Sequence, residues 1–178
     1  FLVFFANIIA AQTTNSVLSQ GDWYKFSIDT TGVFKIDKRL LQQIGISTSN
    51  LNPQKIHIYG NGGNALPVQN SDFRNIDLQE NAIYIAGEND GIFNDNDYIL
   101  FYGQGPHSWT ADTDTKTATH HQNIFSDEAY YFITITDVDG KRVQQKPPVT
   151  SSVTKQINTF DEFVFYEKEL TNIYAVGN

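Results

Sequence analysis

Residues 23–29 read Trp23-Tyr24-Lys25-Phe26-Ser27-Ile28-Asp29, and large apolar residues alternate with polar ones along the run. Successive side chains of an extended chain point to opposite faces, so one face of this segment is apolar and the other is polar. The pattern predicts a β-strand with one buried face. Thr30-Thr31-Gly32 is typical of a turn, and residues 33–36 resume the alternation, so we expect a hairpin here.

Short runs of the same kind follow at residues 55–59, 82–86, 98–102, 130–136 and 141–145. Between the last two, residues 137–140 end in Asp-Gly, which favours a second hairpin. One helix is predicted over about residues 38–44, because Asp37 can cap its first turn and Gly45 can end it. Strands far outnumber helices. The sequence therefore predicts a mainly β fold: an antiparallel β-sandwich or jelly-roll-like domain with one short helix.

The composition excludes several classes of function. The chain has 178 residues, no cysteine and a formal net charge of −8. Without cysteine, this sequence holds no disulfide framework, no zinc–thiolate site and no cysteine nucleophile. An acidic chain without a basic run is poorly suited to bind nucleic acid. Aromatic residues make up 13% of the chain, which favours a folded β domain over disorder.

The two ends of the chain differ in composition from the middle. Residues 1–12 are mostly apolar and precede an abrupt polar stretch, which predicts a truncated signal peptide and an exported protein. A buried edge strand is the alternative interpretation of these residues. We expect residues 16–146 to form the β-sandwich domain and residues 147–159, which begin Pro-Pro and are rich in Ser and Thr, to form a linker. Residues 160–178 are expected to begin a following domain.

The most acidic loop covers residues 87–97 and carries oxygen ligands of the kind that calcium prefers. Its spacing does not match an EF-hand. Asp and Asn side chains also bond their own backbone in ordinary turns, so we expect a structured turn and not a tight calcium site. The side chains considered as calcium ligands are Asp90, Asn94, Asp95 and Asp97.

The four histidines are His57, His107, His120 and His121. Adjacent His120 and His121 would point to opposite faces of a strand, so they are poorly placed to share a metal ion. His57 is expected on an exposed strand face, opposite its apolar neighbours. The chain has no Gly-x-Ser-x-Gly elbow, and no carboxylate pair stands out for glycoside hydrolysis. We therefore assign no catalytic, cofactor-binding or metal-binding residue.

One short pattern occurs twice, each time directly after a predicted strand. The two copies are Tyr59-Gly60-Asn61-Gly62 and Tyr102-Gly103-Gln104-Gly105. Neither copy has the spacing or the lysine of a phosphate-binding loop, so phosphate binding is not expected. We expect the glycines to allow positive φ where each strand leaves its sheet.

Several phrases of the sequence occur in the order in which they occur in one known family. They are Ser16-Val17-Leu18-Ser19-Gln20-Gly21-Asp22-Trp23-Tyr24-Lys25, Thr31-Gly32-Val33-Phe34-Lys35-Ile36, Ile58-Tyr59-Gly60-Asn61-Gly62-Gly63, Leu78-Gln79-Glu80-Asn81-Ala82-Ile83-Tyr84, residues 90–106, His120-His121-Gln122-Asn123, Tyr130-Tyr131-Phe132 and Gly140-Lys141-Arg142. Across about residues 16–166, the chain resembles the N-terminal region of the sortases of the type IX secretion system, which are gingipain-like cysteine peptidases of family C25.

The resemblance implies a cysteine peptidase on the outer-membrane surface of a Gram-negative bacterium. Such an enzyme removes the C-terminal signal domain from exported cargo and attaches the cargo to surface lipopolysaccharide by acyl transfer through a thiolate. The family's catalytic Cys and His lie in a later domain, so no catalytic role passes to a residue here, His120 and His121 included. The implied partners are the downstream peptidase domain of the same chain, exported cargo proteins and an outer-membrane β-barrel protein of the PorV type.

Two hypotheses of function follow from the sequence. In the first, the chain is the noncatalytic N-terminal domain of such a sortase and braces the peptidase domain or docks partners. In the second, it is an independent surface adhesin or carbohydrate-binding β module whose exposed aromatic rings stack on sugars. Neither hypothesis requires a cofactor.

The aromatic tail yields a testable prediction. In residues 163–166, Phe163 and Phe165 share one face of an expected strand while Val164 and Tyr166 share the other, so both faces need cover. We expect this strand to belong to a following domain or to the interface with it. Truncation after Pro148 should then leave the melting temperature unchanged and reduce aggregation, as measured by thermal unfolding and light scattering. A fall of many degrees would show instead that the tail completes the first domain.

Overall fold

The computed structural model describes residues 15–148, 150, 152 and 155–159. The predicted signal peptide at residues 1–12, the predicted start of a following domain at 160–178 and part of the predicted linker at 147–159 lie outside the described residues. The chain divides into two compact units. One contains residues up to 108 together with 122–144, and the other contains residues 109–121 and those from 145 onward. The proposed domain boundaries stay predictions.

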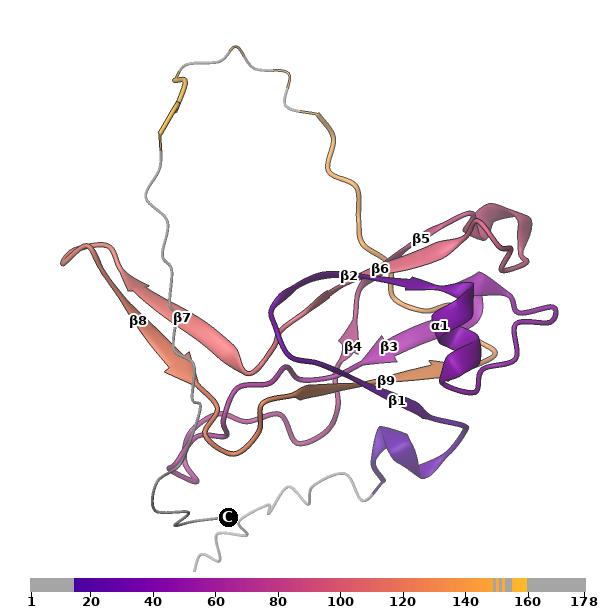
Figure 1. Cartoon of the computed structure of the whole chain (residues 1–178), viewed down its shortest axis with the longest axis horizontal. Helices are drawn as coiled ribbons and strands as arrows, with labels where there is room; N and C mark the ends of the chain where they lie inside the picture. The colour runs from indigo at the N-terminus through magenta and orange to yellow at the C-terminus, as the bar shows by residue number, and fades with distance from the viewer. Residues whose placement is uncertain (1–14, 149, 151, 153–154, 160–178) are drawn as a thin grey trace, which may run out of the picture. The chain divides into compact units, whose positions relative to one another are not determined.

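Two antiparallel sheets form the first unit (Figure 1). The larger has the strand order β1 (Tyr24–Ile28), β9 (Ala129–Ile135), β3 (Ile56–Tyr59) and β4 (Glu80–Asn81). The smaller has the order β2 (Gly32–Asp37), β6 (Tyr98–Gly103) and β5 (Ile83–Ala86). A separate hairpin pairs β7 (His107–Asp112) with β8 (Thr117–Gln122). Short 3-10 turns are η1 (Val17–Ser19), η2 (Pro53–Lys55) and η3 (Glu88–Asp90).

The apolar faces of the two larger sheets meet in one core. Ile58 and Ile133 from the larger sheet and Ile99 from the smaller are fully buried in the same cluster. Aromatic rings join the two layers: the Phe101 ring lies 5.2 Å from the Tyr131 ring and 5.5 Å from the Phe26 ring. Packing of two antiparallel sheets around a shared apolar interior is the sandwich architecture. The prediction of a mainly β, sandwich-like domain is confirmed.

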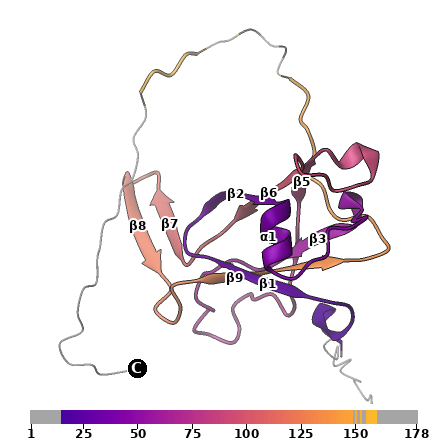
Figure 2. The same cartoon turned by 45° about the vertical axis from the view of Figure 1, so that its right-hand side comes forward.

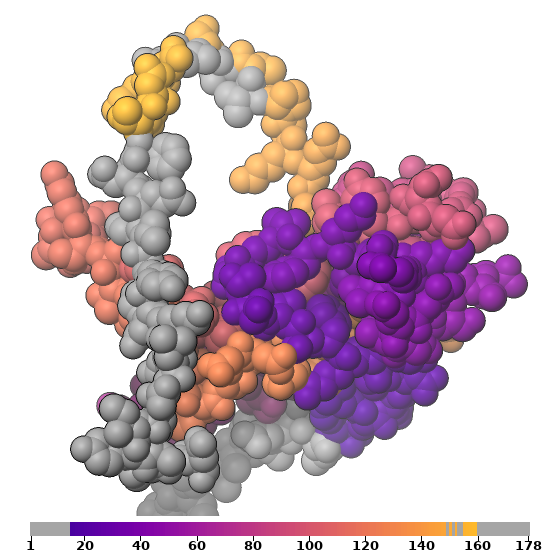
Figure 3. Space-filling model, viewed as in Figure 1, coloured from indigo at the N-terminus to yellow at the C-terminus, as the bar shows by residue number. Residues whose placement is uncertain are grey.

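The one predicted helix is present as α1 (Lys38–Gln43). The carboxylate of Asp37 accepts a hydrogen bond of 2.8 Å from the backbone N–H of Leu40, which caps the first turn as expected. Leu41 is fully buried in the core. Gly45 has a φ of +98°, so the chain leaves the helix through the left-handed conformation that favours glycine. In Figure 3, atoms of the N-terminal third of the chain, coloured indigo and violet, cover much of the visible face of this unit.

The predicted hairpin of residues 23–29 and 33–36 is wrong. β1 pairs with β9, and β2 pairs with β6, so the two consecutive strands belong to different sheets (Figure 2). The alternation correctly marks both strands as having one apolar face. By crossing between the layers at residues 29–31, the chain brings Phe26 and Phe34 to within 5.5 and 5.6 Å of the Phe101 ring. A hairpin would have kept both rings in one sheet.

The second predicted hairpin, around residues 137–140, is also wrong, and residues 141–145 form no strand. Arg142 makes only an isolated parallel bridge to Ile83. The guanidinium of Arg142 donates to the Glu88 carboxylate at 2.8 Å and to the backbone carbonyl of Pro53 at 2.9 Å. These contacts draw the chain across to the smaller sheet, where the backbone of Ile83 pairs with residues 141 and 143.

The sequence pattern predicts no strand at β7 and β8. Most side chains of this hairpin are exposed or half-buried, and polar residues predominate on them. Without a buried face there is no apolar alternation to detect. Its turn is closed by polar groups instead, since the Asp112 carboxylate accepts hydrogen bonds from the backbone N–H groups of Asp114 and Thr115.

The two repeated glycine loops pack directly against the core and against each other. We expected these glycines to adopt positive φ angles, but only Gly62 does, with a φ of +83°. The others are needed for close approach. A Cβ on Gly63 would lie 2.6 Å from the carbonyl carbon of Gly105, and one on Gly105 would lie 2.5 Å from the carbonyl carbon of Thr30.

We predict that Gly105→Ala destabilises the domain, because its new methyl group would meet fixed backbone at residue 30. Overpacking of this kind costs about 1–3 kcal/mol. Thermal or denaturant unfolding measures the loss. Gly32→Ala is the matched control, since a Cβ there meets nothing within 4 Å and the backbone is not in the left-handed region. Equal stabilities of the two variants would contradict this account of the loop packing.

Candidate functional site

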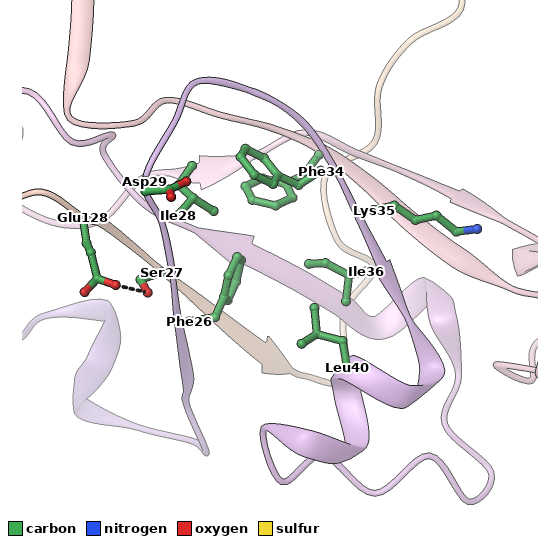
Figure 4. A pocket seen from close by; sticks show the side chains of 10 residues that line it. Phe26, Ser27, Ile28, Asp29, Phe34, Lys35, Ile36, Leu40 and Glu128 are labelled. Atoms are coloured by element: carbon green, nitrogen blue, oxygen red, sulfur yellow. Dashed lines mark hydrogen bonds between the residues drawn. The ribbon is translucent and has the colours of Figure 1, made fainter. Parts of the chain in front are cut away.

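An apolar cleft lies between β1 and β2, the outer strands of the two sheets (Figure 4). Its volume is about 310 Å³, within the usual range for small ligand sites. Figure 4 shows Phe26, Ile36 and Leu40 pointing into the cleft, whereas Lys35 extends away from it. The full lining is Phe26, Ser27, Ile28, Asp29, Phe34, Lys35, Ile36, Leu40, Phe101 and Glu128.

Polar groups at the rim of this cleft bind one another. The Ser27 hydroxyl donates to the Glu128 carboxylate at 3.0 Å, and the Tyr130 hydroxyl donates to it at 2.8 Å. These hydrogen bonds, from Tyr130 first and then Ser27, hold the pKa of Glu128 below its usual value. No histidine is among the lining residues, and most of them are apolar. The cleft therefore suits an apolar ligand.

A second hollow of about 590 Å³ lies on the outer face of the larger sheet. Its aromatic wall is formed by Trp23 and Tyr59, whose rings meet edge to face at 5.2 Å. Thr134, Thr136 and Asp137 supply its polar groups. Burial raises the pKa of the Tyr59 hydroxyl above its usual value, and the negative charge of Glu80 raises it further. An aromatic wall beside hydroxyl and carboxylate groups can stack on and hydrogen-bond a polyhydroxylated ligand.

His57 lies behind this hollow, and the expectation that it is exposed is wrong. Its exposed fraction is only 3%. Nδ1 lies 2.7 Å from the Glu80 carboxylate, while Nε2 lies 2.8 Å from the Thr136 hydroxyl and 3.2 Å from the Val138 carbonyl. The outer face of β3 is also covered at His57, by the Glu80 side chain of the neighbouring strand β4 and by residues 136–138. The alternation of apolar and polar residues in β3 marks the face that packs on the core. It does not show that other parts of the chain also cover the outer face, which carries His57.

The network around His57 is structural. Glu80 also accepts a hydrogen bond of 2.7 Å from the backbone N–H of Lys141. The Thr136 hydroxyl also contacts Val138, with the backbone N–H of Val138 donating to it at 3.2 Å. The imidazole therefore joins β3 to β4 and to the chain segment after β9. Every polar atom of the ring has a protein partner, which leaves none for a substrate or a metal ion.

The other three histidines lie on β7 and β8. The His120 ring packs edge to face on Trp109 at 5.0 Å, whereas Nε2 of His121 lies 3.0 Å from the Thr110 hydroxyl. The adjacent pair thus contacts different neighbours, as expected for side chains on opposite faces of a strand. Within residues 15–148, 150, 152 and 155–159, no three His, Asp or Glu side chains are grouped so that they could hold a metal ion.

The acidic loop of residues 87–97 contains the side-chain-to-backbone hydrogen bonds that the sequence predicts. Asp90 accepts from the backbone N–H of Ile92 at 3.0 Å, and the largely buried Asp97 accepts from that of Asn94 at 2.6 Å. Asp95 instead pairs with Lys38 of α1 at 2.6 Å, and this contact lowers the pKa of the carboxyl group. Two of the four candidate calcium ligands are therefore engaged with backbone donors. That the loop is no tight calcium site stays a prediction.

Comparison with known proteins gives a likeness to a solved structure. No family model matches the chain, and no curated protein matches it. Among solved structures, it is similar to the dimeric latent PorU from Porphyromonas gingivalis, with a TM-score of 0.55 and 25% sequence identity. The alignment covers 74% of this chain but only 11% of that one. The chain thus has a PorU-like fold over a small part of PorU's length. None of the described helices is both long and apolar enough to cross a membrane.

We predict that His57→Ala destabilises the domain, because the substitution removes one hydrogen-bond partner from the Glu80 carboxylate and one from the Thr136 hydroxyl. Lost hydrogen bonds of this kind cost about 1–3 kcal/mol, which chemical denaturation can measure. His121→Ala is the control: its side chain is exposed and has one hydrogen bond, to Thr110. A His57 variant as stable as the control would show that the network does not join the strands as described.

Proposed function

We propose that this chain is the noncatalytic N-terminal domain of a cell-surface sortase of the type IX secretion system. The carrying observation is the likeness to PorU, at 25% identity over 74% of the chain. The ordered sequence phrases at residues 16–166 support the same assignment independently of the fold. In this proposal, the whole enzyme removes C-terminal signal domains from exported cargo and attaches the cargo to surface lipopolysaccharide.

The chemistry of the chain defines what such a domain contributes. Acyl transfer by a cysteine peptidase requires a thiolate, and the chain has no cysteine. The nucleophile would therefore lie in a downstream peptidase domain of the same polypeptide. The N-terminal domain would brace that domain or dock partners, and the apolar cleft and exposed apolar side chains offer surfaces for this role. The proposed setting is the outer-membrane surface of a Gram-negative bacterium, with cargo and a PorV-type β-barrel protein as proposed partners.

A second candidate function is carbohydrate binding by an independent adhesin module. The hollow beside Trp23 and Tyr59 favours it, because an aromatic wall and the hydroxyl and carboxylate groups beside it suit a sugar ring. Isothermal titration with surface polysaccharide, using wild type and Trp23→Ala, tests this function. Binding that Trp23→Ala abolishes would favour an adhesin, provided that the gene encodes no cysteine peptidase after residue 178.

The sortase proposal predicts that activity depends on a part of the polypeptide outside this chain. The purified 178-residue chain should leave a cargo protein with a type IX C-terminal signal intact, whereas the full-length gene product should cleave it. Mass spectrometry of the cargo after incubation measures both. The control is the full-length protein with its candidate catalytic cysteine changed to alanine, which should be inactive. Cleavage by the 178-residue chain, or a gene without a cysteine peptidase domain, would contradict the proposal.

A further inference from the structure

Two neighbouring loops present large apolar side chains almost entirely to solvent. Four of these side chains lie in the loop of residues 62–78 and two in the β8–β9 connection; their exposed fractions run from 70% to 99%. We call this surface the loop patch, and its members are Leu66, Val68, Phe73, Ile76, Ile124 and Phe125. The two loops lie side by side at one end of the sandwich (Figures 1 and 2). The side chain of Asn123 joins them by donating to the Gly63 carbonyl at 2.8 Å.

The base of the longer loop is fixed by hydrogen bonds. The Asn61 side chain donates to the Asp77 carbonyl at 3.1 Å and accepts from the backbone N–H of Gln79 at 2.9 Å. The Asp77 carboxylate in turn accepts from the backbone N–H of Val17 at 2.6 Å and from the Ser16 hydroxyl at 2.9 Å. Loops of more than about 12–15 residues without secondary structure are uncommon in compact domains and are often functional. In this loop, hydrogen bonds hold the two ends together, and the residues between them expose their apolar side chains to solvent.

The size of the loop patch is that of a protein interface. The largest apolar patch on a typical monomer covers about 300–600 Å², whereas each partner in a stable interface contributes about 800 Å². Six large side chains exposed to this degree supply an apolar area on the order of 800 Å², the area that one partner contributes to a stable interface. Isolated apolar residues on a surface need no explanation, but a cluster of this size on adjoining loops indicates a binding surface.

The charge of the two loops restricts the partner of the loop patch. The loops carry Asp72, Asp77, Asp127 and Glu128, and Arg74 is the only basic residue among residues 62–78 and 123–128. An anionic membrane would repel these acidic loops, and a second copy would bring one pair of acidic loops against another. A protein surface with an apolar centre and basic residues around it is complementary.

We propose that a later domain of the same polypeptide docks on the loop patch. This inference rests on the proposed function, in which the chain is one part of a much longer protein. The likeness to PorU, in which the aligned part is 11% of the chain, is consistent with a large amount of polypeptide beyond this domain. A covalently linked partner acts at an effective concentration in the mM range, so an interface of modest intrinsic affinity stays closed. Docking through the loop patch would fix the domain relative to the peptidase.

Hydroxyl-radical footprinting of the full-length gene product tests this proposal, because it reports the solvent access of individual Phe, Leu and Ile side chains. Phe73 and Phe125 should be modified at least ~10-fold more slowly in the full-length protein than in the 178-residue chain, since a tethered partner keeps the surface covered. The double variant Phe73→Asp/Phe125→Asp in the full-length protein should restore modification of Leu66 and Ile76 to the rate in the 178-residue chain. Val33→Asp/Tyr84→Asp, on the exposed face of the smaller sheet, is the matched control and should leave the protection in place.

The possible outcomes separate this inference from the proposed function. An active full-length peptidase with an unprotected loop patch overturns the docking and leaves the sortase assignment standing. A gene without a peptidase domain overturns both. Protection of the 178-residue chain that rises with its concentration identifies a second copy as the occupant. Protection of the full-length protein that appears only with phosphatidylcholine vesicles identifies a membrane, and either result overturns docking by a later domain.

Discussion

The contact between the aromatic rings of Phe26, Phe101 and Tyr131 holds the two sheets of this domain together. The three rings contact one another, and the Tyr131 hydroxyl accepts a hydrogen bond of 2.7 Å from the backbone N–H of Gln104. Burial raises the pKa of this hydroxyl, so it stays a neutral hydrogen-bonding group. The Tyr131 ring also restricts the residue at position 60 to glycine, because a Cβ there would clash with the ring. The glycine at position 60 is therefore a consequence of how the aromatic centre is packed.

Local alternation was sufficient to predict the fold class and most of the strands, but not how the strands pair. The face of β1 that carries Phe26 was identified correctly and β2 was predicted as a strand, yet alternation states only that a face is buried. Whether two consecutive strands pair or oppose each other depends on what fills the space between them, here the Phe101 ring. The same limit applies to residues 141–145, whose course is determined by the distant partners of Arg142, Glu88 and Pro53.

The candidate sites divide along similar lines. The hydrogen bonds of the acidic loop were predictable because Asp90 and Asp97 act on backbone groups only a few residues away. The burial of His57 was not, because Glu80 and the Thr136–Val138 segment that cover it are remote in sequence. Exposed apolar side chains such as Phe73 and Phe125 leave no periodic signal at all, since they lie in loops. Fold likeness contributes what local physics could not, namely a similarity to part of PorU for a chain that has no cysteine.

The crossing of the chain between β1 and β2 leaves both sheets open on the same side. Within the described residues, no strand pairs with the outer edge of either strand. Unpaired edges readily recruit a strand from another molecule, which is a common route to aggregation. Each edge carries a lysine on its solvent face: Lys25 lies 3.6 Å from the centre of the Tyr130 ring, and Lys35 lies 4.4 Å from that of Tyr98. Two copies that paired through the same edge would bring like charges together. The strand order that builds the core thus leaves the edges of β1 and β2 unpaired. The positive charge of one lysine on each edge disfavours edge-to-edge assembly of the domain into fibrils.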